Sequence, residues 1–179
     1  MRKANAVITA LILILFILHG VLGAFQMVGA GGTAHKVLAR AAFTLIIIHT
    51  LIGVKYTVDS LRAIRKSGVS YPGENKLFWA RRISGAGVMV LLGFHFGAFT
   101  QRLDGALRLA HFDGSKLAVS LLLVVMIAFH VIINVKPMLI SFGIRGLKEK
   151  VFDILFVLSI LLLFMAVGFV IYYLRWNVW

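Results

Sequence analysis

Residues 81–102 read RRISGAGVMVLLGFHFGAFTQR, and this stretch decides how the whole chain is interpreted. Between its basic ends lie about 18 residues with the length and apolar character of a membrane-spanning helix. One residue does not fit, because His95 places an ionisable imidazole within that segment. Ionisable side chains inside a bilayer are costly and usually functional. The interpretation therefore depends on whether the other apolar segments carry histidines at matching depths.

The composition indicates an integral membrane protein. Of 179 residues, 61% are hydrophobic, and the mean hydropathy is +0.99. A soluble domain of this size must keep most of its surface polar, so this composition excludes that class. The chain has no cysteine. Disulfides, iron–sulfur ligation, thiolate ligation of haem and covalent haem attachment are therefore excluded.

The net charge of +13 does not indicate nucleic-acid binding. Lysine and arginine gather at the ends of the apolar segments, where such residues anchor helices and set their orientation. We find no basic stripe with interleaved aromatic residues on a water-soluble face.

The expected fold is all-α, a single transmembrane domain (1–179) of five helices. Each apolar segment has the ~20 residues that cross a hydrocarbon core of ~30 Å. We expect residues 57–82 to connect two spans, with a turn at Pro72-Gly73. The opening MRK and apolar run resemble a signal peptide, but the run is too long for one, so we expect a retained helix. The expected spans are 6–28, 36–56, 83–101, 116–135 and 151–173.

The basic residues predict a cytoplasmic N-terminus and an external C-terminus. With that orientation thirteen basic residues lie inside and six outside, and cytoplasmic loops carry the excess. We therefore expect a multi-pass protein of the cytoplasmic membrane. The inner residues are Arg2, Lys3, Lys55, Arg62, Arg65, Lys66, Lys76, Arg81, Arg82, Lys136, Arg145, Lys148 and Lys150. The outer residues are Lys36, Arg40, Arg102, Arg108, Lys116 and Arg175.

Each of the first four spans carries one histidine, and the fifth carries none. His19, His49, His95 and His130 lie twelve to fourteen residues after the start of their spans, or ~18–21 Å along each helix. Successive helices run in opposite directions. His19 and His95 are therefore expected near the outer face, and His49 and His130 near the inner face.

Histidines on alternate helices can face each other across the centre of a bundle and ligate one haem iron axially. Two such pairs predict a dihaem b-type cytochrome. A lone membrane histidine is more often an interhelical hydrogen-bonding group or part of a proton path. Four at matched depths, one per helix, favour haem. We assign no role to His35 and His111 at the outer interface.

Glycines near the histidines fit this interpretation. Gly23 and Gly53 each follow a histidine by four residues, and a missing side chain there leaves room for a flat macrocycle. Gly93 and Gly97 flank His95. Ordinary close packing of helices explains all four glycines equally well.

The segment Arg82-Ile-Ser84-Gly85, with His95 eleven residues after Ser84, resembles a family entrance motif, arginine or glutamine-x-serine or threonine-glycine. Together with the five-helix, four-histidine pattern, it resembles the dihaem cytochrome b anchor subunit of succinate:quinone and quinol:fumarate oxidoreductases. The resemblance implies two haem b groups, the first held by the histidines of helices one and three, the second by those of helices two and four. That pairing agrees with the depths.

The resemblance also implies flavoprotein and iron–sulfur partner subunits on the inner face, and menaquinone or ubiquinone as substrate. No dicarboxylate-converting site is expected in this chain. The chain is shorter than the usual subunit. Its first outer loop, GAFQMVGAGGTAHK, lacks the glutamate that quinol-oxidising relatives place near the outer ends of the spans.

Several side chains are candidates for the haem propionates and for a quinone, although interfacial anchoring explains the cations equally well. The propionate candidates are Arg81, Arg82, Lys55 and Lys136 on the inner side and Arg40 and Arg102 on the outer side. The quinone candidates are Ser84 and Arg82 inside and Gln26, Gln101 and Asp104 outside. Ser84 could equally bond a main-chain carbonyl one turn back.

Two other functions remain open. A quinone-linked cytochrome b of the b561, hydrogenase or formate dehydrogenase type would keep both haems and serve another dehydrogenase. A haem-free proton-coupled transporter would use the histidines as a relay. No carboxylate in the spans is placed to pair with those histidines, and no span is visibly broken, which argues against transport.

Overall fold

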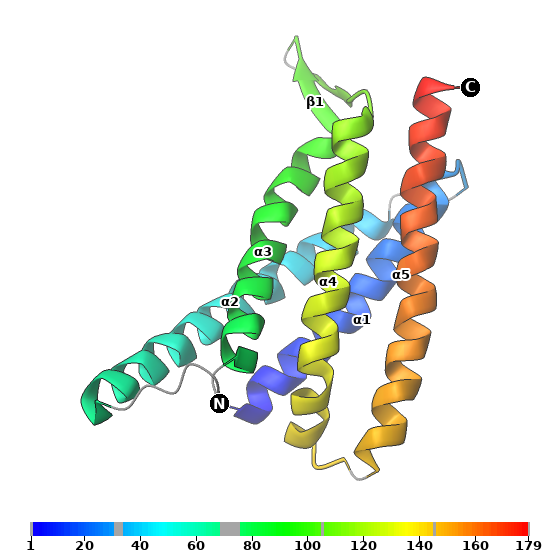
Figure 1. Cartoon of the computed structure of the whole chain (residues 1–179). Helices are drawn as coiled ribbons and strands as arrows, with labels where there is room; N and C mark the ends of the chain where they lie inside the picture. Colours follow the sequence, from blue (N-terminus) through cyan, green and yellow to red (C-terminus); the bar gives the residue numbers. More distant parts are fainter. Residues whose placement is uncertain (1, 31–33, 69–75, 105, 145, 179) are drawn as a thin grey trace.

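The chain folds as five long α-helices and one small hairpin within its described residues (Figure 1). A computed structural model describes residues 2–30, 34–68, 76–104, 106–144 and 146–178. The five helices are long and apolar enough to cross a membrane, which confirms the predicted all-α fold of a multi-pass membrane protein. They are α1 (Arg2–Met27), α2 (Ala34–Ser67), α3 (Lys76–Ala98), α4 (Gly114–Ser141) and α5 (Leu147–Asn177).

The helix neighbours form a ring. Helix α1 packs against α2 and α5 and also touches α4, and α4 packs against α3 and α5, whereas α2 and α3 approach each other only briefly. In the described part of the chain, the backbones of α1 and α3 do not meet, nor do those of α2 and α4. Both helix pairs expected to share a cofactor therefore lie across the bundle from each other. Helices α1 and α2 are tilted away from the direction of α3, α4 and α5 (Figure 1).

The bundle has two ends. The N-end contains the start of α1, and the C-end contains the chain's C-terminus and the hairpin (Figure 1). Strands β1 (Thr100–Leu103) and β2 (Ala106–Leu109) form this hairpin between α3 and α4. Asp104 adopts a φ of 52° at its tip, a backbone conformation that aspartate tolerates better than most residues.

Polar contacts hold the C-end together. Arg175 Nη1 on α5 donates to the Met27 carbonyl at 2.7 Å, at the last turn of α1. Asn177 Nδ2 donates to the carbonyl of Phe112 at 3.0 Å, ahead of α4. Asp113 caps α4 by accepting from a main-chain N–H in its first turn at 3.0 Å. These bonds satisfy terminal groups that the helices leave without partners.

An aromatic cluster forms the buried core at the same end. Phe112 is fully buried, and its ring stacks on Phe99 at 5.4 Å and on Phe169 at 6.5 Å. Ala98 completes the cluster. The rings join α3, α5 and the segment before α4, so they fix the position of the last turn of α3.

A proline within α4 is compensated by a side chain of α3. Pro137 has no N–H and leaves the carbonyl of Ile133, four residues earlier, without its helical donor. Arg81 Nε donates to that carbonyl at 3.2 Å. In a membrane helix each such carbonyl must find a partner inside the protein. Arg81, although it lies on α3, therefore stabilises α4.

Several boundaries differ from the prediction. Helix α2 continues to Ser67, eleven residues beyond the expected span, and α3 begins at Lys76, seven residues before the expected start. Residues 57–67 and 76–82 are thus helical, so α2 and α3 extend into the stretch predicted to connect the two spans. The expected turn at Pro72-Gly73 lies outside the described residues. The third span ends at Ala98, since residues 100–103 form a strand.

Candidate functional site

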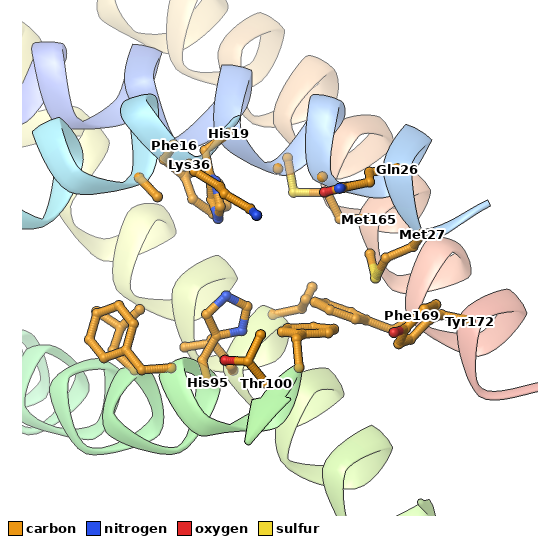
Figure 2. A pocket seen from close by; sticks show the side chains of 18 of the residues that line it. Phe16, His19, Gln26, Met27, Lys36, His95, Thr100, Met165, Phe169 and Tyr172 are labelled. Atoms are coloured by element: carbon orange, nitrogen blue, oxygen red, sulfur yellow. The ribbon is translucent and has the colours of Figure 1, made fainter. Parts of the chain in front are cut away.

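A cavity of about 680 Å³ lies in the half of the bundle nearer the C-end (Figure 2). All five helices contribute to its wall, which is mostly aromatic and aliphatic. Its volume falls within the ~300–1,000 Å³ typical of ligand and cofactor sites. Phe16, Phe43, Phe96, Phe99 and Phe169 supply much of the apolar surface.

His19 and His95 reach this cavity from opposite sides, His19 from α1 and His95 from α3 (Figure 2). Their ring centroids lie 6.3 Å apart, and the ring planes are nearly perpendicular at 87°. An ion bound by two imidazole nitrogens at about 2 Å from each would separate the rings by roughly 6 Å. The spacing therefore fits one metal centre between the two rings.

Neighbouring rings, and no hydrogen bond to Nδ1 from the described residues, hold His95. It contacts Phe99 at 5.4 Å and Phe169 at 6.4 Å between ring centroids. Its Nδ1 is buried without a hydrogen-bond partner in the described structure, and buried polar atoms normally have one. A buried imidazole with an unpartnered nitrogen, placed at an apolar cavity, fits a histidine that binds a ligand better than one with a purely structural role.

The two cations at this cavity are not those predicted for the outer propionates. Lys36, at the start of α2, and Arg175, on α5, both line it. Arg40 and Arg102 are exposed and do not line it, and their role toward a propionate stays a prediction. Arg40 lies one helical turn further along α2 than Lys36. Arg102 lies on the hairpin.

At the N-end, His49 and His130 are both half-buried and hydrogen-bonded through Nδ1. His49 Nδ1 lies 3.1 Å from Asn5 Oδ1 and 3.3 Å from Thr9 Oγ1, both on α1. His130 Nδ1 lies 2.9 Å from Ser84 Oγ on α3. Each histidine is therefore hydrogen-bonded to a side chain of a neighbouring helix.

The His130 ring lies against the backbone of α3. A Cβ built at Gly85 would approach His130 Cε1 to 3.3 Å, tighter than nearly all real contacts of a Cβ. Gly85 thus permits the close approach that brings His130 to Ser84. The glycine of the entrance motif has a steric role next to a histidine.

The inner cations differ in whether their side chains already have partners. Arg81 is bonded to Ile133, and Lys55 forms an exposed ion pair with Asp59 at 2.8 Å. Lys136 is exposed. Arg82 lies over the ring of Phe78 at 4.8 Å and within electrostatic range of both N-end histidines. Its Nε is buried without a partner among the described residues, so Arg82 is the inner cation best placed for an anionic group.

The other predicted residues divide between the cavity and the surface. Gln26 lines the cavity, whereas Gln101 and Asp104 are exposed on the hairpin. Gly23 also lines it, and a Cβ there would meet open space. A Cβ at Gly53 would likewise meet nothing within 4 Å. Gly93 and Gly97 are exposed, and a Cβ at either would meet no described residue within 4 Å, so close helix packing within the described chain does not account for them.

The histidines without an assigned role lie apart from these groups or outside the description. His111 is exposed and packs on Trp176 at 5.5 Å. The side chain of His35 lies outside the described part of the structure. Among the described residues, no group of three or more His, Asp or Glu side chains could hold a metal ion alone. A haem needs only two axial side chains, because its own ring supplies the other ligands.

Sequence reasoning missed four residues that the structure places at these groups. Asn5 and Thr9 are polar side chains four residues apart in an apolar span, which is a signal for one shared helix face. Lys36 and Arg175 were read only as interfacial anchors. No signal in the sequence separates them from Arg40 and Arg102, because the tilt of α2 and the end of α5 decide which cation reaches the cavity.

No protein-family model, curated protein or solved structure matches this chain.

Proposed function

We propose that this protein is a dihaem b-type cytochrome, a membrane subunit that transfers electrons between quinone and a peripheral succinate dehydrogenase or fumarate reductase complex. One observation carries the proposal. Two histidine pairs lie on helices that face each other across the bundle, and His19 and His95 point into one apolar cavity with their rings 6.3 Å apart.

The residues of the chain would position the two cofactors. His19 and His95 would supply the axial nitrogens nearer the C-end, and His49 and His130 those nearer the N-end. Bis-histidine haem carries single electrons and leaves no open position for oxygen. Lys36 and Arg175 would offset negative charge at the C-end cavity, and Arg82 would do so near His49 and His130.

The stacked arrangement supports electron transfer across the bilayer. The two histidine pairs belong to opposite halves of helices that are each long enough to cross a membrane. Electrons could then pass between the two faces without leaving the apolar interior. The excess of basic residues supports a cytoplasmic N-end and a location in the cytoplasmic membrane. The flavoprotein and iron–sulfur partners would dock on that basic face.

Reduction by quinol tests the redox role. The purified protein, reconstituted in liposomes, is expected to show the spectrum of reduced b-type haem when a menaquinol or ubiquinol analogue is added. A preparation that contains no haem after expression with sufficient haem supply would contradict the proposal.

Co-purification tests the partner. We expect the chain to bring down a flavoprotein and an iron–sulfur protein from native membranes, with succinate or fumarate conversion in the eluate. Recovery of a different dehydrogenase with both haems retained would assign the chain to the b561, hydrogenase or formate dehydrogenase type of cytochrome. A haem-free protein that moves protons with a solute would instead be a transporter.

A further inference from the structure

Two hydroxyl groups lie within hydrogen-bonding distance of imidazole nitrogens at the N-end, Thr9 Oγ1 at His49 Nδ1 and Ser84 Oγ at His130 Nδ1. We infer that Ser84 and Thr9, the latter with Asn5, are positioning residues that hold each Nδ1 as a hydrogen-bond donor and leave each Nε2 lone pair free for a metal. This inference rests on the proposed function and deepens it, since it assigns how the N-end histidines are prepared as ligands.

The assignment for His130 follows from a count of hydrogens. A serine hydroxyl has one hydrogen to donate and two lone pairs. Ser84 directs its hydrogen to the main-chain carbonyl of Arg81 at 3.2 Å, within its own helix. The same Oγ lies 2.9 Å from His130 Nδ1, so in that bond the oxygen accepts and the imidazole donates. A neutral imidazole that donates from Nδ1 carries its lone pair on Nε2.

His49 follows the same rule with different residues. Thr9 directs its hydroxyl hydrogen to the main-chain carbonyl of Asn5 at 2.8 Å, so its Oγ1 accepts from His49 Nδ1 at 3.3 Å. The side-chain oxygen Asn5 Oδ1, which has no hydrogen, accepts from the same Nδ1 at 3.1 Å. Both acceptors give the same tautomer.

The two sites were built from different helices, which argues against coincidence. Ser84 lies on α3 and serves a histidine of α4, whereas Thr9 and Asn5 lie on α1 and serve a histidine of α2. In metal sites, a ligating imidazole usually donates its second N–H to a protein oxygen, which orients the ring and raises its basicity. His95 differs, because its Nδ1 has no partner in the described structure.

The inference also changes the role of Ser84. As a quinone donor, Ser84 would need a free hydrogen, and its hydrogen is directed to Arg81. Ser84 is 1% exposed, so a quinone carbonyl has little access to it. Its oxygen acts on the histidine of another helix, and Gly85 beside it makes room for that ring.

Ser84→Ala tests the inference in the haem-loaded protein. We expect about tenfold weaker haem binding at one of the two sites. The midpoint potential of that haem should rise, because its imidazole donates less electron density to the iron. Ser84→Thr keeps a hydroxyl and should restore both properties. Ser120→Ala is the matched control, because Ser120 is also 1% exposed and its Oγ has no partner among the described residues.

A second pair of variants, at Thr9, keeps the inference testable if Ser84→Ala fails to fold. Thr9→Val removes the hydroxyl at nearly constant shape, and Thr9→Ser keeps it. The first should raise the same potential, by less than Ser84→Ala because Asn5 Oδ1 still accepts from His49 Nδ1, and the second should not. If Ser84→Ala and Thr9→Val both keep the midpoint potentials and the haem content of the wild type, the inference is overturned. The two haems themselves would not be in question. A wild-type protein without haem would overturn the proposed function itself.

Discussion

Arg81 on α3 donates its Nε–H to the carbonyl of Ile133 on α4, the group that Pro137 leaves without a helical donor. The bond joins two facts that the sequence presents separately, a proline inside an apolar helix and an arginine at the start of another. The bond replaces the main-chain hydrogen bond that Pro137 removes from a helix that continues to Ser141.

The bond predicts that Arg81 and Pro137 are energetically coupled. Arg81→Met should lower the free energy of unfolding in detergent by roughly 1–3 kcal/mol, the cost of a carbonyl buried without a donor. In a Pro137→Ala background the restored N–H can bond Ile133, so the same change should cost less. Unfolding curves of the four proteins measure the coupling. Equal costs in both backgrounds would show that Arg81 does not serve this carbonyl.

The second prediction concerns the cation at the C-end cavity. Lys36→Gln should lower the midpoint potential of one haem, because loss of a positive charge near the cofactor favours the oxidised form. Arg40→Gln removes the same charge one turn further along α2 at an exposed site outside the cavity, and it serves as the control. Redox titration of both variants checks this, and a larger shift in Arg40→Gln would refute the placement.

A third prediction uses the open space beside Gly23. Gly23→Leu should fill part of the cavity and remove one of the two haems, although His19 and His95 are intact. Leucine favours a helix over glycine, so the fold should not be weakened by the backbone. Gly93→Leu is the matched control, because Gly93 is exposed and does not line the cavity. Haem content per chain is the measurement, and equal loss in both variants would argue against a cofactor next to Gly23.

Orientation can be tested because the chain has no cysteine of its own. Lys66 near the N-end and Arg108 on the C-end hairpin are both exposed. In intact cells a membrane-impermeant maleimide should label Arg108→Cys at once, and Lys66→Cys only after the cells are permeabilised. The reverse pattern would place the N-end outside and would contradict the charge argument.

Hydropathy predicted which segments cross the bilayer but not where the helices end. Residues 57–67 were read as a connection because they are polar, yet α2 continues through them, supported by the Lys55–Asp59 pair at i and i+4. The hairpin was missed although Asp104-Gly105 between short alternating segments is a hairpin signal. The apolar span before it was extended to Gln101, which concealed the first strand.

The candidate site was predictable only in part. The spacing of His19, His49, His95 and His130 indicated two levels, because helix direction and rise per residue are fixed by chemistry. Which polar groups contact those histidines depends on helix tilt and rotation, which packing decides. Ser84 was singled out by its motif, but its contact with His130 requires the backbone of α3 to pass close to the ring at Gly85.

Haem content in four single variants tests the central claim most directly. The wild-type protein should carry two b-type haems per chain in a haemochrome assay. Replacement of His19, His49, His95 or His130 by leucine should in each case leave one, while His111→Leu should leave both. Haem content that stays at the wild-type value in all four variants, or a wild-type protein with none, would contradict the account.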